Sequence, residues 1–431
     1  MSIWSFLPII ILFVCFFIKI PVAYSMVIAS VSYFLLAPGA PDIGMMMQKM
    51  VSANSSFTYL AIPFFTCAGV VFEYAGISSK LYGLCELLVG HTRGGLAMVN
   101  VLQSALMGGL SGSANADAAL DAKMLVPEME KRGFSKAFSC AVTAASSCIT
   151  PIIPPGIILI LYASASNVSV SKMFYSGYIP GIIITITMLL LVWIICKRRN
   201  MKPTRERAAT PGEFLRGFVG AIPALLVPFG LVLGLRFGLY TPTEAGAVCV
   251  LYALVVGFFI YKQIKLSDIP KIIMESAINT AGVMFILAGA QCFSLYLTWE
   301  RVPNMISELM IQGISSPWVY LLIVNILLLI VGMFFDGGAA MILLAPLLVP
   351  VASALGIDLI HFGLVMSFNL TIAGMTPPFG AMMFVATSIT KTRIEDYTRE
   401  ALPFIGQLVL CLLLFTYIPQ IVMFLPNLLG G

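Results

Sequence analysis

The stretch Ile149-Thr150-Pro151-Ile152-Ile153-Pro154-Pro155-Gly156 decides the fold. It lies inside an apolar run from about residue 137 to 167, which is long enough to cross a bilayer. Each proline removes a backbone donor and pushes the preceding residue out of helical geometry, so a helix over this run breaks at membrane depth. The freed amides and carbonyls are tolerated there only when they are buried in protein or face water. The stretch therefore predicts a broken transmembrane helix.

The same pattern occurs a second time, at Pro377-Pro378. The shift that places Pro154-Pro155 on this second pair also aligns other residues without a gap: Pro127 with Pro350, Gly133 with Gly356, Ala163 with Ala386 and Pro180 with Pro403. A gapless register from about residue 120 to 180 indicates an internal repeat. Two interrupted hydrophobic segments at matching places in two halves indicate the binding site of a transporter.

The bulk composition is that of an integral membrane protein. Hydrophobic residues make up 60% of the chain, charged residues make up 10%, and the mean hydropathy is +1.00. The net charge of +5 forms no basic patch with interleaved aromatics, so nucleic acid is not an expected partner. The nine cysteines are scattered through apolar runs, and no CxxC, HExxH or Ser-His-Asp set occurs within the spans, so neither a metal centre nor an enzyme is expected.

Twelve apolar stretches organise the chain. Ten are predicted spans: 3–18, 22–37, 57–75, 137–167 (broken), 177–196, 217–237, 242–261, 271–298, 361–390 (broken) and 402–426. The other two, 95–130 and 317–355, each have a polar, small-residue centre and are interpreted as re-entrant helical hairpins. The alternative is that each is a pair of ordinary spans. Residues 38–56, 77–93 and 300–316 are mixed in character and predict helices lying along the interface.

The basic residues set the orientation. Residues 197–216 hold seven lysines and arginines against two glutamates, so this linker is predicted to be cytoplasmic. The other basic loops fall on the same side only if 95–130 returns to the cytoplasm and 317–355 returns to the outside. The predicted fold is therefore an all-α membrane protein of two inverted five-span repeats, 1–196 and 217–431. Each repeat has one re-entrant hairpin and one broken helix, and both termini lie outside.

A broken helix offers sites for ions of both signs. The half before the break ends in free carbonyls, and these suit a cation. They are expected at Thr150 and Ile153 in one repeat and at Ala373 and Thr376 in the other. The hairpin centres add Ser111, Ser113 and Asn115, or Gly337 and Gly338. Neutral oxygens favour Na⁺ over a divalent ion, which prefers carboxylates, histidine or cysteine. The alternative is that the prolines only kink helices whose hydroxyls satisfy the backbone locally.

The half after each break begins with free amides, which favour an anionic substrate group. The substrate-binding candidates are Asn115, Asp336, Gly156, Phe379 and Gln291. Acids at membrane depth are usually functional, but Asp117 is interpreted chiefly as a helix cap, and Asp336 is left open between capping and ion binding. For Gln291, a contact between helices is the alternative.

Four motifs together resemble a known family. They are Gly109-Leu110-Ser111-Gly112-Ser113 followed by Asp117, the stretch Thr150 to Pro155, Phe335-Asp336, and Met375-Thr376-Pro377-Pro378. The chain resembles, over essentially its whole length, the large DctM-type membrane subunit of tripartite ATP-independent periplasmic (TRAP) transporters. The resemblance implies a multi-pass protein of the bacterial inner membrane and an elevator-type transporter that uses Na⁺ as coupling ion, with no covalent cofactor. It also implies a small four-helix DctQ-type membrane subunit and a DctP-type periplasmic binding protein as partners.

By motif match the resemblance assigns sodium to two residue sets: Ser111, Ser113, Thr150, Ile153 and Pro155 in the first repeat, and Gly337, Ala373, Thr376 and Pro378 in the second. Many relatives carry glycine where this chain has Thr150, so the first site differs in detail. The implied substrates are organic acids: C4-dicarboxylates, sugar acids or sialic acid. A stand-alone sodium/anion symporter of related architecture, which needs no binding protein, is the alternative function. A channel is a further alternative, but two matched breaks suit alternating access better than a continuous pore.

Overall fold

The computed structural model describes residues 3–18, 20–55, 57–302, 305, 308 and 316–429. In this part of the chain the regular structure is helical, and the one β pairing is an isolated bridge between Arg93 and Pro203. Seven helices are long and apolar enough to cross a membrane, or eight if α4 (Ala61–Tyr74) and α5 (Ile77–Val89), bent by 68°, count as one span. The all-α membrane class is confirmed, whereas ten spans were predicted.

The first half of the chain contains one helical hairpin and one broken helix, while the re-entrant course of the hairpin stays a prediction. Its elements are α1 (Ile3–Phe17), α2 (Val22–Leu36), α3 (Ile43–Ala53), η1 (Phe57–Leu60), α4, α5, α6 (Gly95–Ser111), α7 (Ala114–Lys131), α8 (Lys136–Ser146), α9 (Ile157–Ser166) and α10 (Val170–Arg198). Helices α6 and α7 form the hairpin, whose tip is 112–113. The broken helix is α8 and α9, separated by 147–156 around the three prolines.

The second half repeats this plan. Its elements are α11 (Pro211–Arg236), α12 (Pro242–Val255), η2 (Val256–Ile260), η3 (Leu266–Asp268), α13 (Ile269–Trp299), α15 (Pro317–Phe334), α16 (Gly337–Ala354), α17 (Leu359–Met375), α18 (Ala381–Thr390), α19 (Ile394–Tyr417) and α20 (Pro419–Leu429). The second hairpin, α15 and α16, has its tip at 335–336, and α17 and α18 form the second broken helix. The interfacial helix expected at 300–316 lies largely outside the described residues.

Several predicted boundaries differ from the structure. The span 402–426 is two helices, because Pro419 lacks an amide hydrogen and holds Ile418 in non-helical geometry, with φ −124° and ψ 75°. Helix α10 begins at Val170 rather than 177, because the Ser169 hydroxyl accepts a bond from the Lys172 amide and caps it there. The last six residues of the predicted linker are the start of α11, which Thr210 and Glu213 cap reciprocally.

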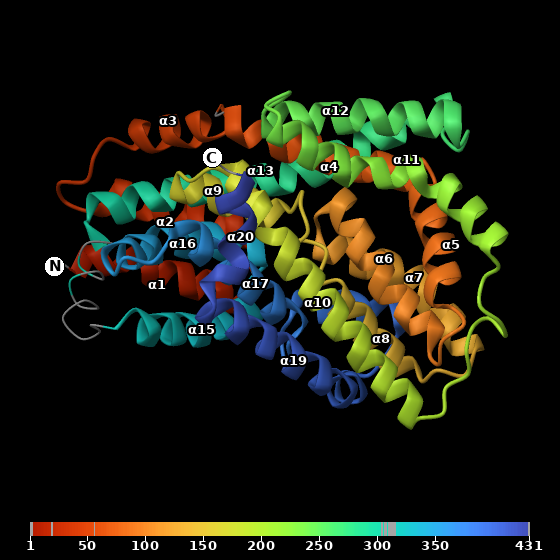
Figure 1. Ribbon diagram of the computed structural model, residues 1–431. Coiled ribbons are helices and arrows are strands. Elements are labelled where there is room, and N and C mark those ends of the chain that lie inside the picture. Colours follow the sequence, from red (N-terminus) through yellow and green to blue (C-terminus); the bar gives the residue numbers. More distant parts are fainter. Residues whose placement is uncertain are drawn as a thin grey trace.

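The two hairpins lie at opposite ends of the molecule, and each also packs on the broken helix of the other half (Figure 1). Within each half, the first arm of the hairpin packs on the first segment of the broken helix: α6 on α8, and α15 on α17. The second arm packs on the broken helix of the other half: α7 on α18, and α16 on α9. The two halves thus share one core. Entry of the hairpins from opposite membrane faces stays a prediction.

Buried amide side chains fasten each hairpin to its broken helix. In the first half, Asn100 of α6 donates to the Thr143 hydroxyl of α8 over 2.7 Å and accepts from Ser146 over 2.7 Å. In the second half, Asn369 of α17 donates to the side-chain oxygen of Asn325 of α15 over 2.9 Å. Since an unpaired polar group costs far more in an apolar interior than in water, these bonds oppose sliding of hairpin against helix.

The linker is attached to both halves. The amides of Thr204 and Arg205 both donate to the Gly90 carbonyl at 2.9 Å, and Arg132 at the end of α7 donates to the Thr204 carbonyl at 2.9 Å. At the other end Arg199 forms a bidentate pair with Glu400 of α19, at 3.0 and 2.8 Å. The linker therefore lies against the end of the molecule that carries the basic loops.

A cysteine in this linker tests the orientation. Ala208 is exposed, so Ala208→Cys is expected to react with an impermeant maleimide only when the cytoplasmic face is accessible, as in inverted membrane vesicles. The background is low because eight of the nine native cysteines are buried and Cys67 is partly so. Labelling in intact, right-side-out vesicles would contradict the predicted topology.

Candidate functional site

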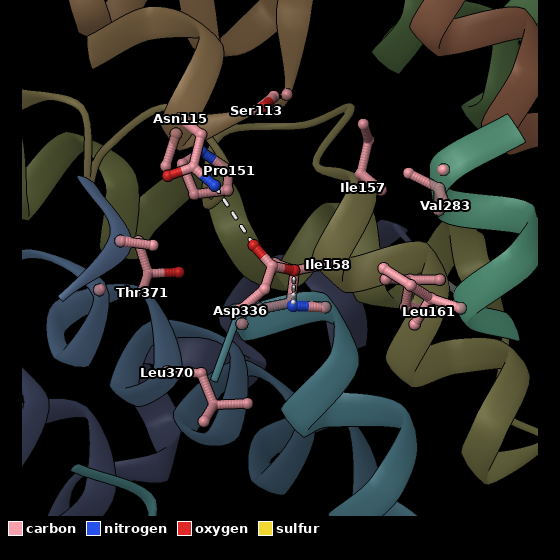
Figure 2. A pocket seen from close by; sticks show the side chains of 18 of the residues that line it. Ser113, Asn115, Pro151, Ile157, Ile158, Leu161, Val283, Asp336, Leu370 and Thr371 are labelled. Carbon is pink, nitrogen blue, oxygen red and sulfur yellow. Dashed lines mark hydrogen bonds between the residues drawn. The ribbon is translucent and has the colours of Figure 1, made fainter. Parts of the chain in front are cut away.

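The two hairpin tips approach each other at the centre of the molecule. The Asn115 amide of α7 donates to the Asp336 carboxylate at 3.2 Å, the dashed line between the labelled residues in Figure 2. The other carboxylate oxygen of Asp336 accepts from the Gly338 amide at 3.0 Å and caps α16. Asp336 therefore caps a helix and also joins the tips.

The first tip docks directly on the first break. Gly112 closes α6 in the left-handed region, with φ +59°, and its carbonyl accepts from the Ile157 amide at 3.3 Å. A Cβ at Gly112 would lie under 3.0 Å from the Pro155 carbonyl oxygen, a distance real Cβ atoms essentially never show. Only glycine meets both requirements. The contact brings Ser111 and Ser113, on either side of Gly112, to the backbone of Pro155.

Thr150 and Ile153 also lie where the first hairpin contacts the first break. A Cβ at Gly108 of α6 would lie 3.0 Å from the Thr150 carbonyl oxygen and 2.9 Å from the Ile153 Cβ, so α6 passes closely over the break. The structure therefore gathers all five residues of the first predicted sodium set around one tip and one break: Ser111, Ser113, Thr150, Ile153 and Pro155.

Asp117 has a different role from the cap that the sequence favoured. Ser113 caps α7, its hydroxyl accepting from the Ala116 amide at 3.4 Å. The Asp117 side chain is 2% exposed, and its Oδ2 accepts from the Thr150 hydroxyl at 2.9 Å. Its Oδ1 and the Ser111 Oγ are buried without a partner among the described residues. Buried oxygens without donors are costly, and a cation between them would satisfy both.

The second set is more open. Gly337 at the tip lies near the Leu370 carbonyl, to which its Cβ would be 3.7 Å, and a Cβ at Gly332 would lie 2.6 Å from the Ala373 Cβ. The Thr376 hydroxyl donates back to the Ile372 carbonyl at 2.8 Å. The Pro378 ring is exposed, whereas Pro155 at the matching position is buried. The first break is therefore enclosed, while the second faces outward.

A cavity of about 440 Å³ lies between the tips. Four helices begin at its wall, two from the hairpins and two from the broken helices. The first two residues of each line the cavity: Ala114 and Asn115 of α7, Ile157 and Ile158 of α9, Gly337 and Gly338 of α16, and Ala381 and Met382 of α18 (Figure 2 labels several of them). Helix α13 closes the cavity with Asn279, Gly282 and Val283.

Helix N-termini dominate the electrostatics of this cavity. Each helix N-terminus carries unpaired amides and about half a positive charge, so four together attract an anionic group. No lysine or arginine occurs among the described lining residues, and Asp336 is their one charged side chain. The Asp336 carboxylate accepts from the Asn115 side chain and from the Gly338 amide, so each of its two oxygens has a donor within the protein.

Three substrate candidates do not line this cavity. Gly156 is enclosed in the first break, where its Cβ would collide with the Pro151 carbonyl. The Phe379 ring packs against Phe334, with centroids 5.0 Å apart. Gln291 lines a separate cavity with Lys49, and its amide donates to the Tyr59 hydroxyl at 3.4 Å. Ser113, Asn115, Asp336 and Gly337 do line the central cavity.

Sequence reasoning missed Asp121 entirely. It is 0% exposed, one turn beyond Asp117 on α7, and accepts from the Gln103 amide at 3.0 Å and the Ser104 hydroxyl at 3.4 Å. Two acids four residues apart inside an apolar run were the available signal, because that spacing places both on one face of a helix.

A family model described as "Tripartite ATP-independent periplasmic transporter, DctM component" matches residues 9–421. The C4-dicarboxylate TRAP transporter large permease protein DctM of Pseudomonas aeruginosa is 36% identical over 89% of each chain. The sialic acid TRAP transporter large permease protein SiaM of Vibrio cholerae is 35% identical over 96% of each chain. The 2,3-diketo-L-gulonate TRAP transporter large permease protein YiaN of Escherichia coli is 36% identical over 88% of this chain and 89% of its own.

Solved structures share the fold at low identity. The YdaH transporter of Alcanivorax borkumensis matches with a TM-score of 0.64 and 14% identity, over 88% of both chains. MtrF of Neisseria gonorrhoeae matches with a TM-score of 0.58 and 13% identity, over 96% of both chains. At such identity the likeness concerns the arrangement of helices alone.

Proposed function

Because the chain belongs to the DctM component family of the tripartite ATP-independent periplasmic transporters, we propose that it imports a small organic anion driven by a sodium gradient. It is a multi-pass protein of the bacterial inner membrane and a large permease of the TRAP type. The observation that carries the proposal is the central cavity, where four helix N-termini face a space without lysine or arginine among its described lining residues. That arrangement favours a carboxylate over a cation.

The substrate class follows from the size and polarity of the cavity. About 440 Å³ holds a small organic acid, and Asn115 and Asn279 offer hydrogen bonds to its other polar groups. The relatives are named for a C4-dicarboxylate, sialic acid and 2,3-diketo-L-gulonate, all organic acids. For a carboxylate that enters between the α9 and α18 N-termini, backbone amides replace the hydrogen bonds to water. Binding of the carboxylate therefore needs no lysine or arginine.

Sodium coupling is proposed from the first break. The predicted ligands Ser111, Ser113, Thr150, Ile153 and Pro155 gather there, and the partnerless oxygens of Asp117 and Ser111 face the same region. Oxygen-only coordination with little formal charge suits an alkali cation that must also leave. The second ion is proposed to bind where the second hairpin meets α17, at Gly337 and Ala373, together with Thr376 and Pro378 of the open second break.

Transport is proposed to move the shared core as one body. The crossed packing of α7 on α18 and of α16 on α9, with the buried amide bonds, ties both hairpins to both broken helices. Helix α13, which closes the cavity from one side, then belongs to the fixed part. An elevator movement past α13 exposes the cavity alternately to the two sides. The proposed partners are the small membrane subunit and a periplasmic binding protein that delivers the anion.

Uptake into proteoliposomes tests the proposal. The chain is reconstituted with the small subunit, and labelled organic acids are supplied together with the periplasmic binding protein. We expect uptake only with an inward sodium gradient and with the binding protein present; replacement of external sodium by choline should abolish it. Sodium-independent uptake would contradict the coupling. Equal uptake without the binding protein would favour the stand-alone symporter.

A further inference from the structure

A second cavity, of about 510 Å³, opens beside the first break and adjoins the central cavity. The two share Ser113, Asn115, Ile157, Asn279 and Val283 in their walls. From there the side cavity runs between α7 on one side and α4 and α13 on the other. It lies on the half of the molecule that carries the first hairpin and the linker (Figure 1). By the predicted orientation this is the cytoplasmic half.

The mouth of the side cavity is charged. Glu73 of α4, Glu275 of α13 and Lys123 of α7 line it, and all three residues are exposed. The Tyr74 hydroxyl donates to Glu275 at 3.1 Å. Farther in, Asp117 adds a third carboxylate to this wall. Three carboxylates against one ammonium give the passage a negative potential, which raises the local concentration of cations and repels anions.

The inner end of the cavity offers oxygens without partners. Thr66 Oγ1, Ser111 Oγ and Asp117 Oδ1 all belong to its lining residues, and all are buried without a hydrogen-bond partner among the described residues. Asp117 is 2% exposed, so its free oxygen is within the protein interior rather than in bulk water. Oxygens alone, with one carboxylate, are ligands suited to Na⁺.

The carboxylates are too dispersed to bind a divalent metal. In the described part of the chain no three His, Cys, Asp or Glu side chains are close enough to hold a metal ion together. The mouth can therefore attract a cation without trapping it, as a route requires.

We propose that this side cavity is the cytoplasmic vestibule of the coupling cation, an inference that rests on the proposed sodium coupling. Na⁺ that leaves the first break passes the oxygens of Thr66, Ser111 and Asp117, and Glu73 and Glu275 attract it to the cytoplasmic mouth. Lys123 opposes its return and so favours release. The negative mouth repels the anionic substrate, so this passage serves the cation and not the anion.

Inhibition by internal sodium tests the vestibule. Proteoliposomes with the chain, the small subunit and a fixed external sodium concentration are loaded with graded internal NaCl, balanced by choline chloride. Glu73→Gln is expected to raise the internal sodium concentration that halves uptake by about fivefold, the order expected for one partly solvated charge. Lys123→Met is expected to lower it by a similar factor. Half-saturation by external sodium stays as in wild type for both.

Matched variants and a binding measurement complete the test. Glu73→Asp keeps the charge and should behave as wild type, whereas a shift equal to that of Glu73→Gln would overturn the electrostatic role. Shifts of the same sign for Glu73→Gln and Lys123→Met, or no shift for either, would also overturn it. If wild-type uptake ignores sodium, the proposed function fails. The sodium dependence of the melting temperature, measured on the purified chain with its small subunit, then tests the vestibule separately. A change in this dependence in Glu73→Gln supports the vestibule, whereas a melting temperature that does not respond to sodium in the wild type overturns it.

Discussion

Gly112→Ala is expected to reduce the initial rate of uptake by at least about tenfold, because a Cβ at this position costs about 1–2 kcal/mol of left-handed strain and also collides with the Pro155 carbonyl. The collision cannot be relieved by a side-chain rotation, because the Pro155 carbonyl oxygen is a backbone atom and the added Cβ is fixed to the Gly112 backbone. The tip must withdraw from the break, which separates Ser111 and Ser113 from Thr150. Uptake per reconstituted protein is the measurement, with the melting temperature recorded in parallel.

Gly133→Ala provides the matched control. Gly133 has φ +87°, in the same left-handed region, but no atom lies within 4 Å of its would-be Cβ. It therefore bears the conformational strain without the collision, and its uptake should stay close to wild type. If the two variants lost uptake equally, the loss would come from strain alone and the tip contact would carry no function.

Asp117→Asn is expected to raise the sodium concentration for half-maximal uptake by at least about tenfold, because it removes the carboxylate that contacts Thr150 in the first break, where the effective dielectric constant is low. The asparagine oxygen can still accept the Thr150 hydroxyl. The fold is therefore expected to keep its stability without sodium, since a neutral amide costs less to bury than a carboxylate. Sodium titration of uptake and of the melting temperature measures the two effects separately.

Asp121→Asn makes the same exchange one turn away. Asp121 is equally buried on α7, but it lines neither cavity and accepts its bonds from Gln103 and Ser104. Its sodium requirement should match wild type. A shift as large as that of Asp117→Asn would mean that the overall charge of α7, rather than a carboxylate facing the break, sets the sodium affinity.

The sequence predicted the features that depend on local chemistry. Prolines within residues 149–156 and at Pro377-Pro378 determine both breaks, because a missing amide hydrogen disrupts a helix whatever surrounds it. The tips were predictable from small polar residues inside apolar runs. Polar ends of helices were harder: α19 begins at Ile394, well before its apolar run, with Glu395 and Asp396 in the first turn. Hydropathy alone cannot detect charged turns at an aqueous end.

What the sequence could not supply is the partner of each residue. Asp117 was expected to cap α7, but the distance from Asp117 to Thr150 is set by the packing of α7 against the first break. In the same way Phe379 turns to Phe334 and Gln291 to Tyr59 because of contacts between distant segments. The packing of α16 on α9 and of α7 on α18 has no local sequence signal either. The internal repeat shows that the two halves are similar, but it does not show which of their helices are in contact.

The four helix ends around the central cavity have a consequence for the range of cargo. Peptide dipoles neither gain nor lose protons, so the attraction of the four helix ends for an anionic cargo does not change with pH. Helix N-termini also lack the planar, bidentate hydrogen-bonding geometry with which an arginine guanidinium recognises a carboxylate. The cavity is therefore expected to discriminate by size, and the finer chemical selection is assigned to the proposed periplasmic binding protein.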